Sequence, residues 1–172
     1  MALTDLGALA TKVLTVMGGY LADLLAEYDV DLPTEQYVGA GEIAWDCEAL
    51  VVYLGSIQPG EPGQARATSG YPDTMNFSVT LYVELLRSVA TLGYEGTGSA
   101  SVPDTEELNS DGITEMTDAA CLVKAAMNMR SNKDIVARSI DLVIGQVVVI
   151  GPQGGLVSTR LELIIPLSAA NG

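Results

Sequence analysis

The stretch from Val147 to Leu167, VVVIGPQGGLVSTRLELIIPL, places a glycine-rich segment between two apolar runs. Such glycines either lead from a strand into a helix and cradle a phosphate, or turn the chain between two strands of a hairpin. Apolar and polar residues alternate after the glycines, which is the period of a strand, and no Lys-Ser or Lys-Thr pair follows them. The sequence therefore predicts a hairpin, with strands over Ile140–Ile150 and Leu156–Leu167, and no nucleotide site.

Three further strands are expected upstream of this hairpin. A short extended piece lies around Tyr37–Val38, and the apolar, β-branched run Cys47–Ile57 is typical of a strand covered on both faces. From Asn76 to Leu85 apolar residues alternate with polar ones, which predicts one core face and one wetter face.

Two helices are expected. Apolar residues at steps of three and four predict a helix over Thr4–Tyr28, in which close approach by another backbone is one explanation for Gly18–Gly19. A second helix is expected to open at Pro103 and to end near Arg130. Its predicted apolar stripe consists of Leu108, Gly112, Met116, Ala119 or Ala120, Val123 and Met127.

The order α-β-β-β-α-β-β predicts an α+β fold, with a mixed, largely antiparallel sheet of about four to five strands flanked by two main helices. A single domain over 1–172 is expected, with long loops near 58–74 and 91–103, where Gly, Pro and Ser cluster. The segment 131–139 is ambiguous between a short helix and an irregular link.

Charge excludes several classes of partner. The chain has 22 acidic and 8 basic residues and a net charge of -14, which argues against a nucleic-acid footprint and against adsorption to an anionic membrane. The N-terminus does not resemble a signal peptide, and no run of membrane-spanning length is predicted. Cys47 and Cys121 fall in different elements, so buried thiols in a reducing compartment are expected rather than a disulfide.

No enzymatic site is predicted. The absence of histidine removes the commonest general base and most zinc sites. Asp46 and Glu48 would share a strand face, but no second pair can be placed opposite them, and Cys47 has no histidine to activate it. The trio Asp29, Asp31 and Glu35 matches a calcium loop only weakly, because the glycine and the final glutamate of that loop are missing. We therefore expect no catalytic, cofactor-binding or metal-binding residues.

One aromatic residue stands out as a candidate for protein contact. Trp45 is the sole tryptophan and lies in a glycine-rich approach to a strand, where a large side chain could anchor an interface.

The order of motifs along nearly the whole chain resembles the tail terminator proteins of long-tailed bacteriophages, especially those of actinobacteria. After the first helix come Tyr37-Val38-Gly39-Ala40-Gly41 and then Ala44-Trp45-Asp46-Cys47 at the start of an apolar strand that ends in Ser56-Ile57-Gln58-Pro59-Gly60. Three further features complete the order: the segment Glu-Leu-Leu-Arg over Glu84–Arg87, an acidic second helix, and the Gly151-Pro152-Gln153-Gly154-Gly155 hairpin. The long loop 58–73 and the segment 131–139 depart from the family pattern and leave strand registers and ring contacts in doubt.

This resemblance implies a structural virion protein at the junction of tail and neck, made in the host cytoplasm. It would form a homo-oligomeric, hexameric ring that caps the tail tube, ends tail polymerisation and presents a docking surface to the head-tail stopper or connector. DNA would pass through an acidic lumen without specific binding. The candidate interface residues are Trp45 and Asp46 at the strand start and Pro152 and Gln153 at the hairpin tip.

Three alternatives stay open at this point. Another neck protein, such as a stopper or a head-completion protein, would share partners but have another fold. A small acidic hydrolase built on Asp46 or Glu48 belongs to a different class, and a bacterial adaptor domain is the third.

Overall fold

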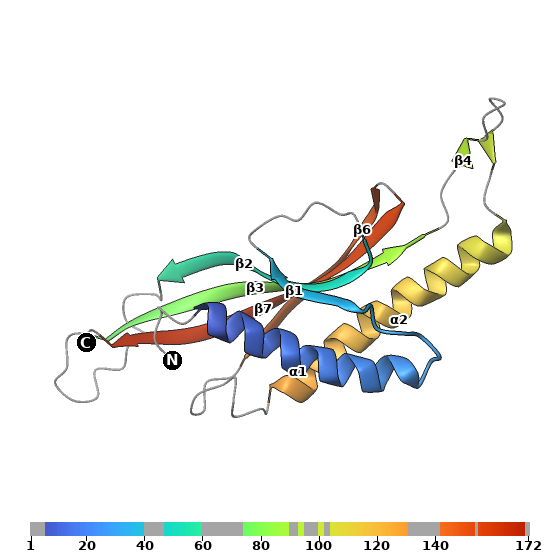
Figure 1. The fold of residues 1–172 in the computed structure, drawn as a ribbon. Coiled ribbons are helices and arrows are strands. Elements are labelled where there is room, and N and C mark those ends of the chain that lie inside the picture. Colours follow the sequence, from blue (N-terminus) through green and yellow to red (C-terminus); the bar gives the residue numbers. More distant parts are fainter. Residues whose placement is uncertain are drawn as a thin grey trace.

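The computed structural model describes residues 6–39, 47–59, 74–89, 93–94, 100–101, 104–130, 142–153 and 155–170. Two helices and a five-stranded mixed sheet confirm the predicted α+β class (Figure 1). In chain order the elements are α1 (Leu6–Ala26), β1 (Glu35–Gly39), β2 (Ala49–Pro59), β3 (Thr74–Ser88), β4 (Gly93–Tyr94), β5 (Ala100–Ser101), α2 (Thr105–Met129), β6 (Val143–Gln153) and β7 (Leu156–Ala170).

The main sheet has the strand order β1-β2-β3-β7-β6. Strand β1 runs parallel to β2, and every other neighbouring pair is antiparallel. The central pair, β3 and β7, is in register along its full length from Thr74↔Ala170 to Ser88↔Leu156. This pair lies at the centre of the sheet, and α1 packs mainly against β1 and β2 whereas α2 packs against β6 and β7.

The two predicted loops differ from expectation at their ends. Strand β2 continues to Pro59 and β3 begins at Thr74, and the rest of the loop predicted near 58–74 lies outside the described residues. The region 91–103, predicted as loop alone, contains β4 and β5, which pair as a separate two-stranded sheet. The ambiguous segment 131–139 is also outside the described residues.

Both helices pack on one face of the main sheet (Figure 1). Alternate residues of three strands meet them, as the period-2 pattern predicted. The core on this face comprises Leu50, Val52, Val79, Leu81, Val83, Leu85, Leu161, Leu163 and Ile165 from the strands, with Leu9, Val13, Met17, Leu21 and Leu25 from α1. The opposite face, here called the open face, also buries Val51, Tyr53 and Leu86, so β2 is covered on both faces over its first half, as expected.

The apolar stripe predicted for α1 is confirmed, since the large residues at steps of three and four are buried. The helix ends at Ala26, and the N–H groups of Asp29 and Val30 then donate to the carbonyls of Ala26 and Leu25. Asp29 has a φ of 56°, the left-handed conformation that closes helices in this way.

The two glycines in the middle of α1 have different surroundings. A Cβ on Gly18 would lie 2.9 Å from Gln36 Oε1 and 3.7 Å from Leu50 Cδ2, so this glycine lets the helix approach β1 and β2 closely. The neighbours are side chains rather than the other backbone considered above. A Cβ on Gly19 would meet nothing within 4 Å.

By length and composition alone α1 could cross a membrane, contrary to the expectation that no run reaches spanning length. The fold gives the physical reason for its apolar character, because Leu9, Val13, Met17 and Leu21 lie fully buried in the core. A core helix passes the same compositional test as a membrane span.

The predicted hairpin of β6 and β7 is confirmed by its pairing. Val149 pairs with Thr159 and Gln153 with Leu156, with register shifts between Ile144 and Val147 and between Ile150 and Gln153. Gly155 has a φ of 83°, which a glycine adopts without strain and which the turn requires. The chain therefore reverses between the two strands with Gly155 in the turn, while Gly151 belongs to β6.

The stripe predicted for α2 is wrong. The buried residues are Asp118, Cys121, Leu122, Ala125, Ala126 and Met129, whereas Leu108, Met116 and Met127 of the predicted stripe are 49%, 76% and 60% exposed. The helix also begins later than Pro103. Asp104 is its N-cap, accepting from the N–H of Glu106, and the Glu107 carboxylate accepts from the N–H of Asp104, which completes a capping box.

Candidate protein interface

The structure leaves the four predicted interface residues untested. Trp45 and Asp46 lie outside the described residues. Pro152 and Gln153 lie at the end of β6, where the backbone alone is described and Gln153 pairs with Leu156 at the hairpin turn. Their contact with a neighbouring subunit stays a prediction.

The acidic residues considered for a hydrolase or a metal site do not form such a site among the residues that the structure describes. Glu48 is exposed, and its Oε1 accepts from the backbone N–H of Ser88 at 2.9 Å, which ties the start of β2 to the end of β3. Over the described residues, no group of three or more His, Cys, Asp or Glu side chains could hold a metal ion. The trio Asp29, Asp31 and Glu35 is therefore not gathered into a site.

The cysteines differ from one another. Cys121 is buried as expected, and its burial raises the pKa of its thiol, whereas Cys47 is exposed, so the expectation of a buried thiol is wrong there. Neither of these two residues forms a disulfide. Cys47 is exposed because it lies just before β2, whose buried part begins at Ala49.

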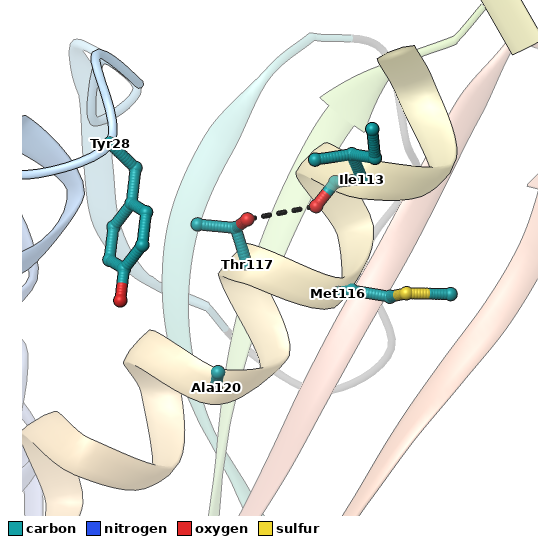
Figure 2. Close-up of a pocket in the computed structure, with 5 residues that line it drawn as sticks. All are labelled: Tyr28, Ile113, Met116, Thr117 and Ala120. Atoms are coloured by element: carbon teal, nitrogen blue, oxygen red, sulfur yellow. Dashed lines mark hydrogen bonds between the residues drawn. The ribbon is translucent and has the colours of Figure 1, made fainter. Parts of the chain in front are cut away.

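The surface that stands out instead is a hollow between α1 and α2, here called the α2 hollow. Its lining residues are Tyr28, Ile113, Met116, Thr117 and Ala120, and its volume is about 230 Å³. Figure 2 shows Tyr28, just beyond the end of α1, facing Thr117 on α2, whose hydroxyl donates to the Ile113 carbonyl at 2.8 Å. Because that hydroxyl is engaged by its own helix, the lining presents a largely apolar surface to solvent.

Large apolar side chains of this hollow are exposed to an unusual degree. Tyr28 is 58%, Ile113 66% and Met116 76% exposed. Single exposed apolar residues are ordinary on proteins, but a contiguous group marks a contact surface. These three residues come from two parts of the chain and line one hollow, so we treat them as a candidate protein interface.

The surroundings of the α2 hollow are acidic. Glu27, Asp29 and Asp31 flank Tyr28 in the chain, and the first half of α2 with its cap carries Asp104, Glu106, Glu107, Asp111 and Glu115. Between Asp104 and Ala120 there is no basic residue, and Lys124, one turn further on, lies 3.9 Å from Glu27. Partial burial, Asp111 and Asp118 together raise the pKa of the Glu115 carboxyl.

A buried ion pair fixes the orientation of α2 beneath this surface. Arg87 of β3 donates through Nε to Asp118 Oδ2 at 3.0 Å and through Nη2 to Oδ1 at 3.1 Å. Its Nη1 also donates to the Asp31 carbonyl at 2.6 Å. Burial raises the pKa of Asp118, and the two bonds from Arg87 oppose that rise. One guanidinium thus joins β3, α2 and the turn after Tyr28.

A polar cluster lies on the open face of the sheet. Glu84 is 1% exposed and accepts from the Ser158 hydroxyl and from Arg160 Nη2, the latter at 3.4 Å. The Arg160 guanidinium lies over the rings of Tyr82 and Tyr53, 5.3 and 5.6 Å from their centroids. The pKa of Tyr53 is raised by burial and by the Glu84 charge. The buried Glu84 carboxylate is thus paired with Arg160 and hydrogen-bonded by Ser158, which is the arrangement of a polar network that stabilises the sheet.

The outermost strands of the sheet are a further exposed apolar region. On β6, Val143, Val148 and Val149 are 49%, 39% and 44% exposed, and Val38 on the opposite edge strand β1 is 41% exposed. Val148 and Val149 are consecutive, so β6 exposes apolar side chains on both faces. Edge strands of this kind offer unpaired backbone groups and apolar side chains to another chain.

The apolar periodicity of α2 places Met116 and Met127 on the predicted core stripe, whereas the structure exposes both side chains. The signal that separates them from core residues is the second apolar set on the same helix, formed by Cys121, Leu122, Ala125, Ala126 and Met129. A helix with two apolar faces exposes one of them unless it is enclosed on both sides.

Comparison with known proteins finds similarity to solved structures and no match by sequence. No protein-family model matches the sequence, and no curated protein matches it. A solved structure described as an extracellular contractile injection system, "PVC sheath/tube terminator in extended state", is similar over 92% of this chain with 14% identity and a TM-score of 0.34. This chain spans 57% of the length of that chain. A similarity of this degree does not by itself establish a shared function.

Proposed function

We propose that this protein is a non-enzymatic structural subunit of a phage-like tail, which assembles as a hexameric ring on the end of the tail tube. The ring ends polymerisation of the tube and offers a docking surface to a head-side stopper or connector. Its place is the junction of tail and neck in the virion.

The observation that carries this proposal is the pair of sheet edges, β1 and β6, beside which the structure describes no further strand. Strand β6 exposes Val143, Val148 and Val149, and strand β1 at the other edge exposes Val38. Two different edges on one subunit suit a head-to-tail contact, in which β6 of one copy meets β1 of the next. Such a contact generates a ring when the rotation between copies closes.

The order of sequence motifs supports the same proposal. Gly151, Pro152 and Gln153 of the hairpin motif end β6 and its Gly155 comes just before β7, and Cys47 of the Trp-Asp-Cys motif lies just before β2. Both motifs that carry the resemblance to tail terminators thus border strands of the main sheet. The hairpin motif lies beside the β6 edge that the proposed ring contact uses.

Electron microscopy of the purified protein, alone and mixed with tail-tube protein, tests the proposal. We expect rings of about six subunits, because cyclic closure of a single head-to-tail contact gives a ring. We also expect tubes of arrested length when the protein is present. A monodisperse monomer that leaves tube length unchanged would contradict the proposal, and finding the protein on filled heads alone would favour a stopper instead.

A substitution on β6 sharpens this test. Val149→Lys places a charge on the edge strand, and lysine at an edge opposes pairing with another chain. Rings should be lost in this variant, whereas Met127→Lys on α2, at a side chain that is 60% exposed, should still form them. Ring loss in both variants, or in neither, would show that the β6 edge is not the contact.

A further inference from the structure

We propose that the α2 hollow, lined by Tyr28, Ile113, Met116, Thr117 and Ala120, is a docking site for a basic amphipathic segment of a partner protein. An apolar side chain of that segment seats among Tyr28, Ile113 and Met116. Its flanking lysine or arginine residues meet the acidic groups around the hollow. The inference rests on this surface alone and does not require that the protein form a ring.

The size of the hollow favours a side-chain anchor. Its volume of about 230 Å³ is below the range of roughly 300–1,000 Å³ typical of small-molecule pockets. Its lining carries no charged side chain, and of its two hydroxyls, on Tyr28 and Thr117, the one on Thr117 already donates within the helix. The Tyr28 phenol is thus the one lining hydroxyl outside the helix's own bonds, and the rest of the lining suits an aliphatic or aromatic side chain.

The charge around the hollow selects the kind of partner. Glu27, Asp29 and Asp31 lie next to Tyr28 in the chain, and Glu106 and Glu107 lie at the start of α2, so this surface has an acidic border. Among the described residues, two basic side chains lie near it: Lys124 is 3.9 Å from Glu27, and Arg87 is paired with Asp118. Charge complementarity across an interface steers association and suppresses partners of like charge. A positively charged segment therefore fits this surface.

The same charge argues against the other possible occupants. A second copy of this chain has a net charge of -14 and would bring an equally acidic surface to the contact. Nucleic acids and anionic lipid surfaces carry negative charge themselves and would be repelled. A basic protein segment is the remaining class that satisfies both the apolar hollow and its acidic border.

Binding of a labelled synthetic peptide tests the inference. The probe is an amphipathic peptide of about four helical turns, with leucines along one face and lysines beside them. Two matched peptides replace all lysines with glutamate or all leucines with serine. The intact protein should bind the basic amphipathic peptide measurably and the two matched peptides at least about tenfold more weakly, because charge and apolar anchor both contribute.

Substitutions locate the binding to the hollow. Met116→Gln should weaken binding of the basic peptide about tenfold, since burying such a side chain on binding contributes on this scale. Met127→Gln, on the same helix but outside the hollow, should change affinity by less than about twofold. Both side chains are exposed, so both variants should fold, and circular dichroism verifies this before binding is measured.

A charge substitution separates electrostatic from apolar contributions. Asp29→Asn keeps a residue that tolerates the φ of 56° and removes one charge beside Tyr28, so affinity should fall about two- to fivefold at low salt and less at high salt. Glu162→Gln on the opposite face of the sheet should leave affinity unchanged.

Several results would overturn the inference. One is equal weakening by Met116→Gln and Met127→Gln, and another is a glutamate peptide that binds as tightly as the lysine peptide. Self-association of the protein that Met116→Gln abolishes would identify a second copy as the occupant. Binding to phosphatidylserine vesicles that Met116→Gln abolishes would identify a lipid surface. Since the readout is peptide affinity, these results are independent of whether rings or arrested tubes are seen.

Discussion

The two helices pack on the same face of one sheet, yet they use their apolar residues differently. In α1 the large residues of the single apolar stripe, among them Leu9, Met17 and Leu21, are fully buried. In α2 the buried face combines the small Cys121, Ala125 and Ala126 with Leu122 and Met129, and the large Ile113, Met116 and Met127 are exposed. Apolar periodicity therefore locates the core face of α1 but not that of α2.

The difference has a cause that periodicity does not register. Asp118 is fully buried on the inner face of α2 and is held by two hydrogen bonds from Arg87, 31 residues away in the sequence. A buried carboxylate without its partner is costly, so the position of Arg87 on β3 selects which side of α2 faces the sheet. Ala125 and Ala126, about two turns further along α2, are fully buried on the same helix.

The largest expected contrast between the helices is in the free energy of unfolding. Leu21→Ala in α1 should lower it by about 2–5 kcal/mol, because the side chain is fully buried and leaves a cavity. Met116→Ala in α2 should change it by no more than about 0.5 kcal/mol, because the side chain is 76% exposed. Urea denaturation of the two variants measures both values, and similar losses would mean that Met116 is enclosed in the folded protein.

A smaller contrast separates the two glycines of α1. Gly19→Ala should raise the free energy of unfolding by about 0.5–1 kcal/mol, since alanine is the better helix former and its Cβ would meet nothing within 4 Å. Gly18→Ala should raise the free energy of unfolding by a smaller amount, because the new Cβ would lie 2.9 Å from Gln36 Oε1. In the double variant Gly18→Ala/Gln36→Ala the steric conflict is removed, so its stability gain should come closer to that of Gly19→Ala. Thermal denaturation measures these gains. An equal gain from both glycines would show that Gly18 is not sterically constrained.

The smallest expected effect concerns like charges on α2 and depends on pH. The raised pKa of Glu115 means that the folded protein binds this proton more tightly than the unfolded chain. The resulting stability is fully present below the ordinary carboxyl pKa and is lost as pH rises through the raised value.

Glu115→Gln should therefore be more stable than the parent by about 0.2–0.5 kcal/mol at neutral pH, the usual cost of like charges one turn apart. The difference should vanish below about pH 4, where carboxylates are protonated. Urea denaturation at both pH values measures it, with Asp23→Asn on α1 as a control for the loss of one charge. A stability gain that persists at acid pH would point to helix propensity rather than to charge.

Much of the fold could be predicted from local patterns. Alternation from Asn76 to Leu85 and from Leu156 to Leu167 located the central strands, and steps of three and four located α1, because these periods directly reflect which side of an element is buried. The position of β7 between β3 and β6 could not be predicted, since it depends on pairing between strands far apart in the chain.

The candidate interface was harder to predict than the fold. Met116 and Ile113 have the composition of core residues, and their exposure follows from the Arg87–Asp118 pair and from the position of Tyr28 beyond α1. Trp45 and Asp46, chosen from local sequence, lie outside the described residues and stay predictions. Tertiary contacts of this kind leave no local period in the sequence.

The placement of β7 has a consequence for how the chain acquires its structure. Strand β3 ends at Ser88 and its partner β7 begins only at Leu156, yet these two strands form the longest ladder of the sheet. Closing so long a loop before its contacts form slows folding. A ribosome-bound chain that has emerged only through α2 exposes one whole edge of β3, together with the apolar residues that β7 will cover. Until β7 emerges, this edge is open to pairing with other chains, so the timing of synthesis matters for a protein whose finished sheet still has open edges.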